Sequence, residues 1–358
     1  MTTLPRVGDA VDDLAGLWRW YADQFRGDSR IYGRIADAVA ADREVLEILS
    51  EAPPAAHLPP AALAAVHYLL LDGFDHPLAD VYAGRSETDP GPLFCGLCRT
   101  ERTNLLALLE TRRVQTNDCG RSAIIGPALT WATAHVAGPY YLIDVGASAG
   151  INLHCDRYRL DYGDHGVTGP DDSTVRVACE VTGGNPPIAE RLPTFAGRVG
   201  IDRSPIDLSD PADAQWLLAC VWPDTGRVER VQASIRLAQQ DPVPMVAGRA
   251  NDVLPHVLTE LPPAATALVM TTWAFSYFSI EERAQFLDLL RDESQRRRIV
   301  WLCADTRLAL DTFDDLATGD RGGAEVLVAV VFEGGIEARH LLGFVHPHGN
   351  WIDWRATF

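Results

Sequence analysis

The sequence predicts an α/β protein in which an all-α N-terminal domain precedes a doubly wound β-sheet that ends in an antiparallel hairpin. No segment before residue 113 has the pattern of a strand, whereas short apolar runs alternate with helical stretches after residue 138. Near the C-terminus two apolar runs flank a Gly-Gly pair, which is typical of a hairpin. The 358 residues suffice for two domains, which we place at 1–113 and 114–358.

The N-terminal domain is predicted from the spacing of its apolar residues. Leu14, Trp18 and Tyr21 recur at the interval of one helical face. A proline-rich connector at 51–60 then interrupts the helical pattern, because proline cannot continue a helix interior. The helices expected in this domain are 11–27, 31–50, 61–71 and 102–113.

The second domain is predicted from apolar runs that are too short for helices and that suit buried parallel strands. One of the intervening helices opens with a capping box, Ser279 and Glu282. Residues 156–196 lack the strand–helix alternation, so we expect an insertion there, with a small hairpin at 173–183. The expected strands are 139–146, 197–202, 243–248, 266–273 and 297–304, followed by the hairpin of 324–335 and 337–351.

Composition narrows the choice of partner. The formal net charge of −18 opposes binding to phosphate backbones and anionic membrane surfaces, so we expect neither nucleic acid nor a membrane as partner. The sequence contains no lysine, which excludes Schiff-base catalysis and a Walker-type phosphate loop. No apolar run reaches the ~18–20 residues of a membrane span, and no signal peptide is visible. We therefore expect a cytoplasmic protein with a small-molecule substrate.

The seven cysteines do not form a metal-binding pattern. Cys95 and Cys98 make a lone C-x-x-C, and a zinc site would need two more ligands. Cys119 or Cys155 could be brought in by the fold. We expect buried thiols and no metal.

The stretch LIDVGASAGINL, residues 142–153, predicts a strand, a tight turn and the start of a helix. Gly146 and Gly150 bracket the turn, where small residues let a ligand approach the main chain. Asp144 precedes the first glycine, where it would repel a pyrophosphate but suit a cation or a hydroxyl. The same residues could instead cap the turn and pack the sheet.

This stretch resembles motif I of the class I S-adenosylmethionine-dependent methyltransferases, D/E-x-G-x-G-x-G, with Ser148 in place of the middle glycine. The resemblance implies a Rossmann-like methyltransferase sheet with S-adenosylmethionine as cofactor. In VGIDRSP, Asp202 matches the acid that binds the ribose hydroxyls, with Arg203 beside it. Asp202 lies about fifty residues after Gly150, so this match requires the insertion at 156–196 to extend away from the sheet as a loop.

Further residues carry the same resemblance. In AGRANDVLP, Asn251 and Asp252 match the pair that contacts adenine, although the pair could instead cap a helix. Trp273 is expected near the mouth of the site. Asn152, on the first helical turn after the glycines, is either a cofactor contact or an exposed residue.

More closely, the chain is similar to an uncharacterised bacterial family known as domain of unknown function 2332. That similarity covers most of residues 60–358 and implies no substrate. The segments that carry it are HYLLLDGFDHPLADVY, QTNDCGRS, DVGASAGINLHCDRYRLDYG, GIDRSPID and HPHGNW.

The segment QTNDCGRS, residues 115–122, is the densest polar patch before the sheet. Gln115, Asn117 and Arg121 could clamp the cofactor, with Arg121 pairing its carboxylate through two parallel hydrogen bonds. The alternative is a hydrogen-bond network between the domains.

Candidate bases are few. Tyr277 follows the fourth strand, where many methyltransferases place groups that face the substrate. His67 and His76 lie on or beside an apolar helix, where packed histidines are common. His346 and His348 are expected in a turn that the fold could bring to the rim of the sheet.

The sequence thus predicts a methyltransferase that uses S-adenosylmethionine on a small-molecule acceptor, with the helical domain as a lid. One alternative is a nicotinamide-dependent oxidoreductase on a related sheet. Another is a protein that binds S-adenosylmethionine for other chemistry or without catalysis, since a fold does not determine function. The acceptor and the oligomeric state are left open.

Overall fold

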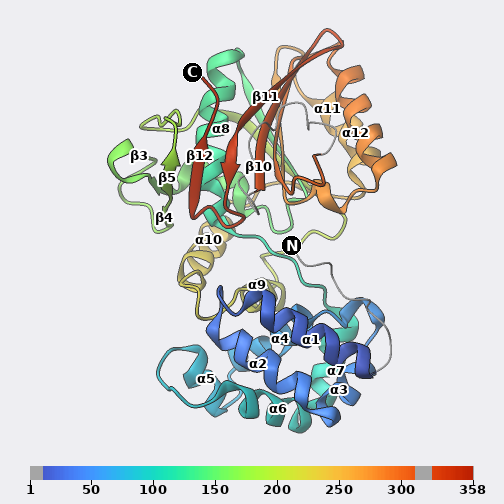
Figure 1. Ribbon diagram of the computed structural model, residues 1–358. Coiled ribbons are helices and arrows are strands. Elements are labelled where there is room, and N and C mark those ends of the chain that lie inside the picture. The colour runs from blue at the N-terminus through green and yellow to red at the C-terminus, as the bar shows by residue number, and fades with distance from the viewer. Residues whose placement is uncertain (1–10, 311–324, 358) are drawn as a thin grey trace. The chain divides into compact units, whose positions relative to one another are not determined.

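The computed structural model describes residues 11–310 and 325–357. The chain forms two compact units (Figure 1): a helical unit of residues up to 116 together with 209–232, and an α/β unit of residues 117–208 and from 233 onward. The predicted domain boundary was a single one, between residues 113 and 114. In the structure the chain enters the helical unit a second time, so residues 209–232 belong to that unit.

Several helices of the helical unit begin at capping side chains. The Ser29 hydroxyl accepts a hydrogen bond from Tyr32 N and donates one to Asp224 at 2.6 Å, so the cap also holds the 209–232 segment. The helices are α1 (Val11–Phe25), α2 (Arg30–Ala41), α3 (Arg43–Ser50), η1 (Pro54–Ala56), α4 (Pro59–Leu71), α5 (Pro77–Tyr82), α6 (Pro90–Thr100), α7 (Arg102–Thr111) and α9 (Pro211–Ala219); α10 (Val228–Gln240) begins in this unit.

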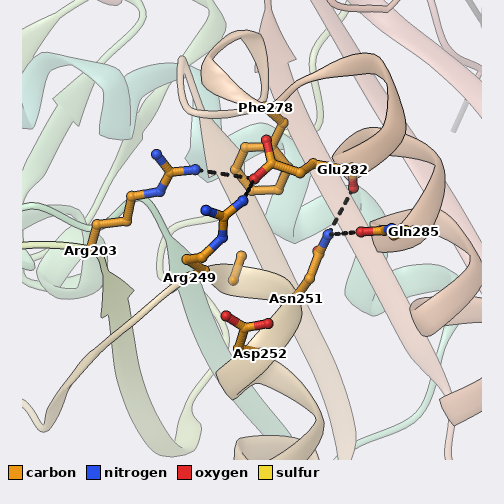
Figure 2. Close-up of a pocket in the computed structure, with 8 residues that line it drawn as sticks. Arg203, Arg249, Asn251, Asp252, Phe278, Glu282 and Gln285 are labelled. Carbon is orange, nitrogen blue, oxygen red and sulfur yellow. Dashed lines mark hydrogen bonds and ion pairs between the residues drawn. The ribbon is translucent and has the colours of Figure 1, made fainter.

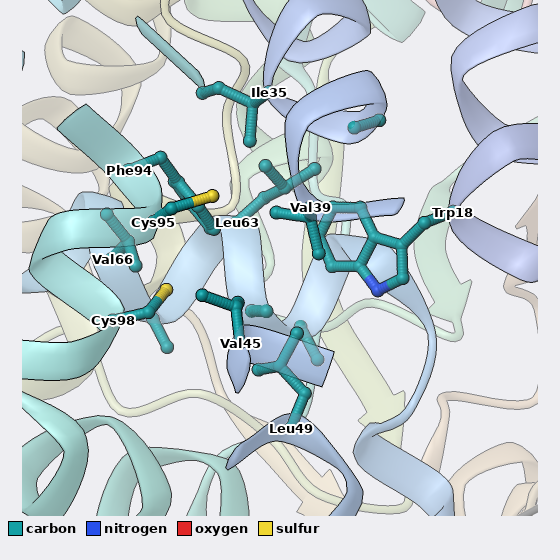
Figure 3. Packing of buried hydrophobic residues seen from close by; sticks show 14 of the residues in the cluster. Trp18, Ile35, Val39, Val45, Leu49, Leu63, Val66, Phe94, Cys95 and Cys98 are labelled. Carbon is teal, nitrogen blue, oxygen red and sulfur yellow. The ribbon is translucent and has the colours of Figure 1, made fainter. Parts of the chain in front are cut away.

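A continuous apolar core fills the helical unit (Figure 3). Trp18 from α1, Leu63 from α4 and Phe94 from α6 are all buried in it. Cys95 and Cys98 lie in the same cluster, and burial raises the pKa of the Cys95 thiol to about 12 and that of Cys98 further. Thiols that stay protonated pack as small apolar groups, as the sequence analysis expected for this pair.

The α/β unit is built on a nine-stranded sheet of order β5-β12-β11-β10-β9-β8-β1-β6-β7. The strands from β9 to β7 pair in parallel, whereas β10, β11 and β12 pair antiparallel. The predicted mixed α/β fold with a large parallel portion is confirmed. The strands are β1 (Tyr140–Val145), β5 (Glu180–Gly183), β6 (Phe195–Asp202), β7 (Met245–Ala247), β8 (Thr266–Thr272), β9 (Ile299–Asp305), β10 (Glu325–Glu333), β11 (Ile336–Val345) and β12 (Trp351–Trp354).

The C-terminal hairpin is confirmed as well. β10 and β11 pair antiparallel along their length, and Gly334 and Gly335 form the turn with φ angles of +60° and +81°. Two successive residues with positive φ match the tight turn that suits the twist of paired strands, which is why the sequence has two glycines there.

Helices α11 (Ala250–Glu260) and α12 (Ile280–Glu293) cover part of the sheet (Figure 1). Leu254 of α11 and Phe286 of α12 share a buried cluster with Ile143 and Trp301 from the strands. Helix α8 (Ser122–His135) also contacts β9. In the part of the chain that the structure describes, no helix has the length and apolarity to cross a membrane.

The insertion differs from its prediction, because residues 173–183 do not form a hairpin. β4 (Arg176–Ala178) pairs in parallel with β2 (Arg159–Asp161) in a small sheet of order β3-β2-β4, whereas β5 joins the large sheet beside β12. Only Cys179 separates β4 from β5, too little for a hairpin loop, so the chain runs on from one sheet into the other. The small sheet also holds β3 (Val167–Thr168) and is preceded by η3 (Ile151–Arg157), with η4 (Gly163–His165) between β2 and β3.

Candidate functional site

The carboxyl ends of the parallel strands β1, β6 and β8 meet at one edge of the sheet, where ligands bind in open α/β folds. The turn after β1 is tight: Gly146 N and Ala147 N donate to Ile201 O at 2.8 and 3.1 Å. Gly146 and Gly150 have φ angles of +82° and +73°, and a Cβ at Gly146 would overlap the side chain of Ala274. The sequence needs glycine here because of conformation and close approach.

Ser148 has a φ of +55°, a left-handed conformation that is uncommon for a residue other than glycine. Glycine adopts this conformation without steric cost, so Ser148 stands at a position that favours glycine. Ser148 N donates to Asp202 Oδ2 at 2.8 Å, and Ser204 N donates to Asp202 Oδ1 at 2.9 Å. The carboxylate at the end of β6 thereby ties that strand to the turn after β1.

The predicted helix after the turn is η3, which is a 3-10 helix. Asn117 bonds main-chain N–H groups at the start of η3 that would be free at a simple helix N-terminus. Its Oδ1 accepts from Ala149 N and Ile151 N, each at 3.3 Å. Two main-chain donors that would otherwise face an anion are thus taken up by a side chain. Asn152 is buried on η3, and its Nδ2 has no hydrogen-bond partner among the described residues.

Asp144 is the most unusual group at this edge. Its side chain is 1% exposed, and neither carboxylate oxygen has a hydrogen-bond partner among the described residues. Burial raises the pKa of Asp144 to about 7, Arg121 opposes the rise, and Asp202 adds to it. A buried carboxylate without hydrogen bonds is costly, so the site is suited to a ligand that brings donors or positive charge.

Arg121 lies beside Asp144 on η2 (Cys119–Arg121) and is buried. It donates from Nη1 to Thr272 O at 3.1 Å and from Nε to Pro347 O at 3.2 Å, and its guanidinium lies 4.7 Å from the Trp273 ring centre. Burial lowers the pKa of Arg121, while nearby acids, Asp144 among them, raise it. Arg121 therefore ties the end of β8 to the loop after β11 and supplies positive charge near Asp144.

The three residues of the predicted clamp are divided between the units. Asn117 and Arg121 belong to the α/β unit and contact the site, whereas Gln115 belongs to the helical unit. There a main-chain group of Gln115 hydrogen-bonds the Cys220 thiol, whose pKa burial raises to about 12. The same division holds for the proposed bases, since His67 and His76 also lie in the helical unit.

Both of those histidines have structural contacts. His67 is buried, its Nδ1 lies 3.1 Å from Ala219 O, and burial lowers its pKa to about 4. His76 caps α5, accepting from Leu78 N at 3.2 Å, and partial burial lowers its pKa. Tyr277, in η5 (Phe275–Tyr277) of the α/β unit, is 81% exposed.

A small hollow of about 100 Å³ lies where Arg203, Asn251 and Asp252 come together (Figure 2). Arg203 follows β6 whereas Asn251 and Asp252 lie in the first turn of α11, so the fold makes neighbours of predicted cofactor residues from two separate segments. The complete lining is Arg203, Arg249, Ala250, Asn251, Asp252, Phe278, Glu282 and Gln285.

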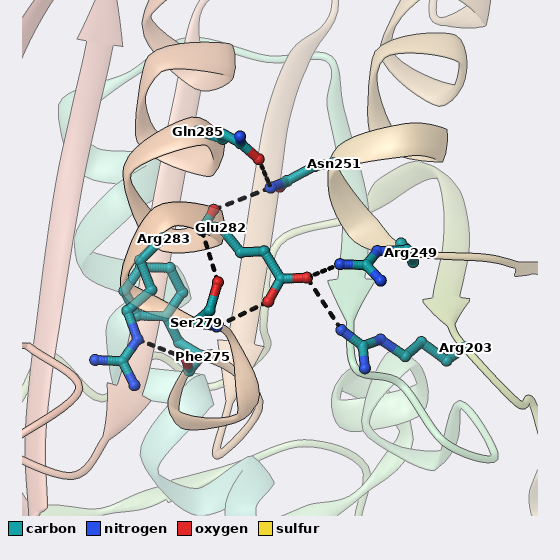
Figure 4. A network of polar contacts seen from close by, with 8 residues as sticks. All are labelled: Arg203, Arg249, Asn251, Phe275, Ser279, Glu282, Arg283 and Gln285. Atoms are coloured by element: carbon teal, nitrogen blue, oxygen red, sulfur yellow. Dashed lines mark hydrogen bonds and ion pairs between the residues drawn. The ribbon is translucent and has the colours of Figure 1, made fainter.

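Glu282 organises this hollow (Figure 4). Its carboxylate accepts from Ser279 N at 2.8 Å, from Arg203 at 3.3 Å and from Arg249. The Ser279 main chain is the largest cause of the lowered pKa of Glu282, and the two arginines lower it further. The capping box predicted from the sequence is confirmed, and it also engages both arginines.

Asn251 faces the same hollow. Its Nδ2 donates to Glu282 O at 2.9 Å and contacts Gln285 Oε1 at 3.5 Å, which orients the amide (Figure 4). Its Oδ1 is buried without a hydrogen-bond partner among the described residues. Asp252, next to it, is exposed. An acceptor that is buried, oriented and unused is suited to a ligand N–H group.

Trp273 follows β8 and is held in a left-handed conformation with φ of +54°. Its main-chain N donates to Ala304 O at 2.8 Å, whereas its indole Nε1 is buried with no hydrogen-bond partner among the described residues. Strained residues of this kind persist where the surroundings hold them in place, and they often mark functional sites. Trp273 was predicted to lie near the mouth of the site, and it directly follows the end of β8.

Sequence reasoning missed the pairing of Asp118 with His348. The two side chains form a hydrogen bond of 3.0 Å between Asp118 Oδ2 and His348 Nδ1. The pair lies close to Arg121, which donates to Pro347 O beside His348. The signal was present in the segments QTNDCGRS and HPHGNW, both of which were identified as distinctive. What the sequence could not show is that residues 230 positions apart would meet.

Asp305 and Glu325 are two further acids that sequence reasoning missed. Asp305, at the end of β9, accepts from Ser276 N at 3.0 Å and from Thr306 N at 2.7 Å, and so holds the chain after Trp273. Burial raises the pKa of Glu325 to about 7, and Asp305 adds to the rise.

Comparison with known proteins identifies a family but supplies no activity. A search of curated proteins gave no match to this chain. Residues 16–354 match the model of a family described as "Uncharacterized protein conserved in bacteria (DUF2332)". This match covers nearly the whole chain and confirms the resemblance noted in the sequence. The protein is therefore a member of the DUF2332 family of bacterial proteins.

Proposed function

We propose that the protein is an S-adenosylmethionine-dependent methyltransferase with a Rossmann-like fold and a small-molecule acceptor. The observation that carries the proposal is Asp144, a buried carboxylate at the end of the first strand, next to a glycine turn, that has no hydrogen-bond partner within residues 11–310 and 325–357. S-adenosylmethionine has a primary ammonium and a sulfonium and no phosphate. An ammonium group would supply both the charge and the hydrogen bonds that Asp144 lacks.

Asn251 supports the same cofactor at a second point. Its buried Oδ1 faces a hollow and has no partner among the described residues. The amino group of adenine is a donor of the kind this oxygen can accept. Phe278 in the same lining provides an apolar surface, and Asp202 lies at the end of β6 between the hollow and the glycine turn.

The same details argue against a dinucleotide. Arg203 and Arg249 are the cations of the hollow, and both pair with Glu282. Asn117 takes up two of the main-chain donors after the turn, where a pyrophosphate would need them. An aspartate at the end of the first strand would repel phosphate.

When bound, S-adenosylmethionine supplies a methyl group activated by a sulfonium. The residues of this chain then bind and orient: Asp144 the ammonium, Asp202 the ribose hydroxyls, and Asn251 the adenine amino group. Arg121 keeps the end of β8 in place through Thr272 O. Placing two reactants in line supplies much of the rate of a displacement reaction, so positioning groups are the essential machinery.

Calorimetric titration with S-adenosylhomocysteine and, separately, NADH tests the proposal. We expect the homocysteine compound to bind and NADH not to bind. Asp202→Ala should weaken binding at least tenfold, because hydrogen bonds to a charged group are worth about 1.5–3 kcal/mol. Asp164→Asn, an exposed acid in η4, is the matched control and should bind normally. NADH binding without S-adenosylhomocysteine binding would overturn the proposal, and unchanged affinity in D202A would remove Asp202 from the site.

A further inference from the structure

The Asp118–His348 pair lies at the same sheet edge as the proposed cofactor site, and neither residue is among the proposed cofactor contacts. Asp118 is buried, with 4% of its side chain exposed, whereas 28% of the His348 side chain is exposed. A buried carboxylate that holds a part-exposed imidazole is the arrangement by which enzymes orient a general base.

Each member of the pair is fixed from more than one side. Asp118 Oδ1 accepts from Gly120 N at 2.9 Å, while Oδ2 contacts His348 Nδ1 at 3.0 Å. His348 N donates to His346 Nδ1 at 3.1 Å, which shapes the turn that carries the imidazole. A Cβ at Gly349 would overlap Gly120 O, so the loop after β11 is packed directly onto η2.

Neighbouring residues of the same segment connect the pair to the glycine turn. Asn117, one residue before Asp118, accepts from Ala149 N and Ile151 N. Arg121, three residues after it, donates to Pro347 O at 3.2 Å and lies over Trp273. The imidazole is thereby held at a set position relative to the turn and to the end of β8, as a base that serves this site must be.

The geometry points to His348 as the general base that deprotonates an acceptor hydroxyl, with Asp118 as its positioning residue. A base of this strength implies that the acceptor is a phenol or enol. This inference rests on the proposed methyltransferase function. Because Nδ1 faces Asp118, Nε2 takes the hydroxyl proton as the oxygen forms its bond to the methyl carbon. The carbon–sulfur bond breaks with its electron pair going to sulfur, so the products are a methyl ether, S-adenosylhomocysteine and a protonated imidazole.

The acceptor class follows from the base and from the side chains nearby. Imidazole is a base near neutral pH, and a phenol with a pKa of about 10 lies within its range, whereas an aliphatic alcohol is far less acidic. Trp273 and the exposed ring of Tyr277 follow β8 at this edge and suit a flat aromatic acceptor. A neutral amine would need no such base.

The test measures formation of S-adenosylhomocysteine from S-adenosylmethionine with phenol, catechol and the more acidic 4-nitrophenol. We expect wild-type protein to methylate a phenol. His348→Gln should slow transfer to phenol or catechol by about 10²–10⁴-fold, the range of general-base catalysis. It should change transfer to ionised 4-nitrophenol only a few-fold, because that acceptor has already lost its proton. His165→Gln, an exposed histidine in η4, is the control and should match wild type.

Two readouts do not depend on turnover. Calorimetry should show S-adenosylhomocysteine binding to His348→Gln as tightly as to wild type, within about twofold, which also shows that the variant is folded. Histidine ring ¹⁵N spectra of the free protein, assigned with His348→Gln, should show neutral His348 with its proton on Nδ1. Asp118→Asn should abolish that tautomer preference.

The outcomes separate the two proposals. Failure of the wild-type protein to bind S-adenosylhomocysteine overturns the methyltransferase proposal itself. Binding without transfer to any of the three phenols overturns the hydroxyl-acceptor inference alone. An equal loss of rate in His348→Gln for phenol and for ionised 4-nitrophenol, or a proton on Nε2 in wild type, removes His348 as the base.

Discussion

Two acids at the edge of the sheet, Asp144 and Glu282, have opposite environments. Glu282 accepts from the Ser279 main chain and from two arginines, and these contacts lower its pKa. Asp144 is fully buried, has no hydrogen-bond partner among the described residues, and has its pKa raised to about 7. The carboxylate of Glu282 is satisfied by the protein, whereas that of Asp144 finds no donor in the described parts of the chain. The comparison shows that burial without partners, rather than acidity, distinguishes a candidate binding group from a structural one.

The largest effect on stability is expected from Asp144→Asn, which removes the ionisable group of the buried acid. Wild-type Asp144 keeps its proton to about pH 7 in the native state, whereas in the unfolded chain it loses it near pH 4. Native stability therefore falls as the pH rises through this window, by up to about 4 kcal/mol. In urea unfolding followed by circular dichroism, D144N should be more stable than wild type by up to that amount at pH 8 and similar to it at pH 4.

The exposed-acid variant Asp164→Asn is the control and should follow the wild-type pH curve. If D144N and wild type had parallel pH curves, Asp144 would already be ionised and paired in the native state. The same variant should lose S-adenosylhomocysteine affinity at pH 8 by at least tenfold, because the ion pair with the ammonium is gone.

A substitution in the glycine turn next to Asp144 should have a smaller effect on stability. Gly146→Ala should lower the free energy of unfolding by about 1–3 kcal/mol, because alanine is strained at a φ of +82° and its Cβ overlaps Ala274. Gly163→Ala has a similar φ of +61° with open space around it, so it measures the conformational cost alone. The difference between the two, found by urea unfolding, gives the cost of the overlap. Equal losses would mean that the close approach to Ala274 is unimportant.

The smallest effect on stability is expected from replacing Glu282, the acid whose carboxylate already has partners. Glu282→Gln should change stability only slightly, because Arg203 and Arg249 are more than half exposed and surface ion pairs contribute little. Glu281→Gln, its exposed neighbour on α12, is the control. Thermal unfolding of the two variants checks this expectation. A loss in E282Q as large as that in G146A would show that its two ion pairs act as buried pairs.

Much of the fold followed from local patterns. The strands, the Gly-Gly hairpin and the capping box at Ser279 each depend on residues that are close in sequence, and the structure contains all three. The hairpin expected at 173–183 was wrong because β4 and β5 each found a partner far along the chain. Segment 209–232 likewise belongs to the helical unit because of contacts such as Ser29–Asp224. Contacts between residues so far apart in the sequence cannot be predicted from a local pattern.

The candidate site was predictable in the same uneven way. Asp144, Gly146 and Gly150 stand in one short motif, so their proximity could be inferred from sequence. The convergence of Asp202 on Ser148 N followed from the register of neighbouring parallel strands. The partnership of Asp118 with His348 joins two segments at opposite ends of the α/β unit's sequence, and it exists only because β11 ends beside η2.

By itself, the sequence determined the order of elements, the glycine turn and the acid that precedes it, because these depend on residue type and on short-range spacing. The tertiary structure alone decided which polar groups have partners. Within the described part of the chain it left Asp144 and Asn251 Oδ1 without hydrogen-bond partners, satisfied Glu282, and placed Asp118 against His348. The reason is physical: hydrogen bonding and burial are properties of the three-dimensional neighbourhood, and a carboxylate has the same letter in the sequence whether or not it finds a donor.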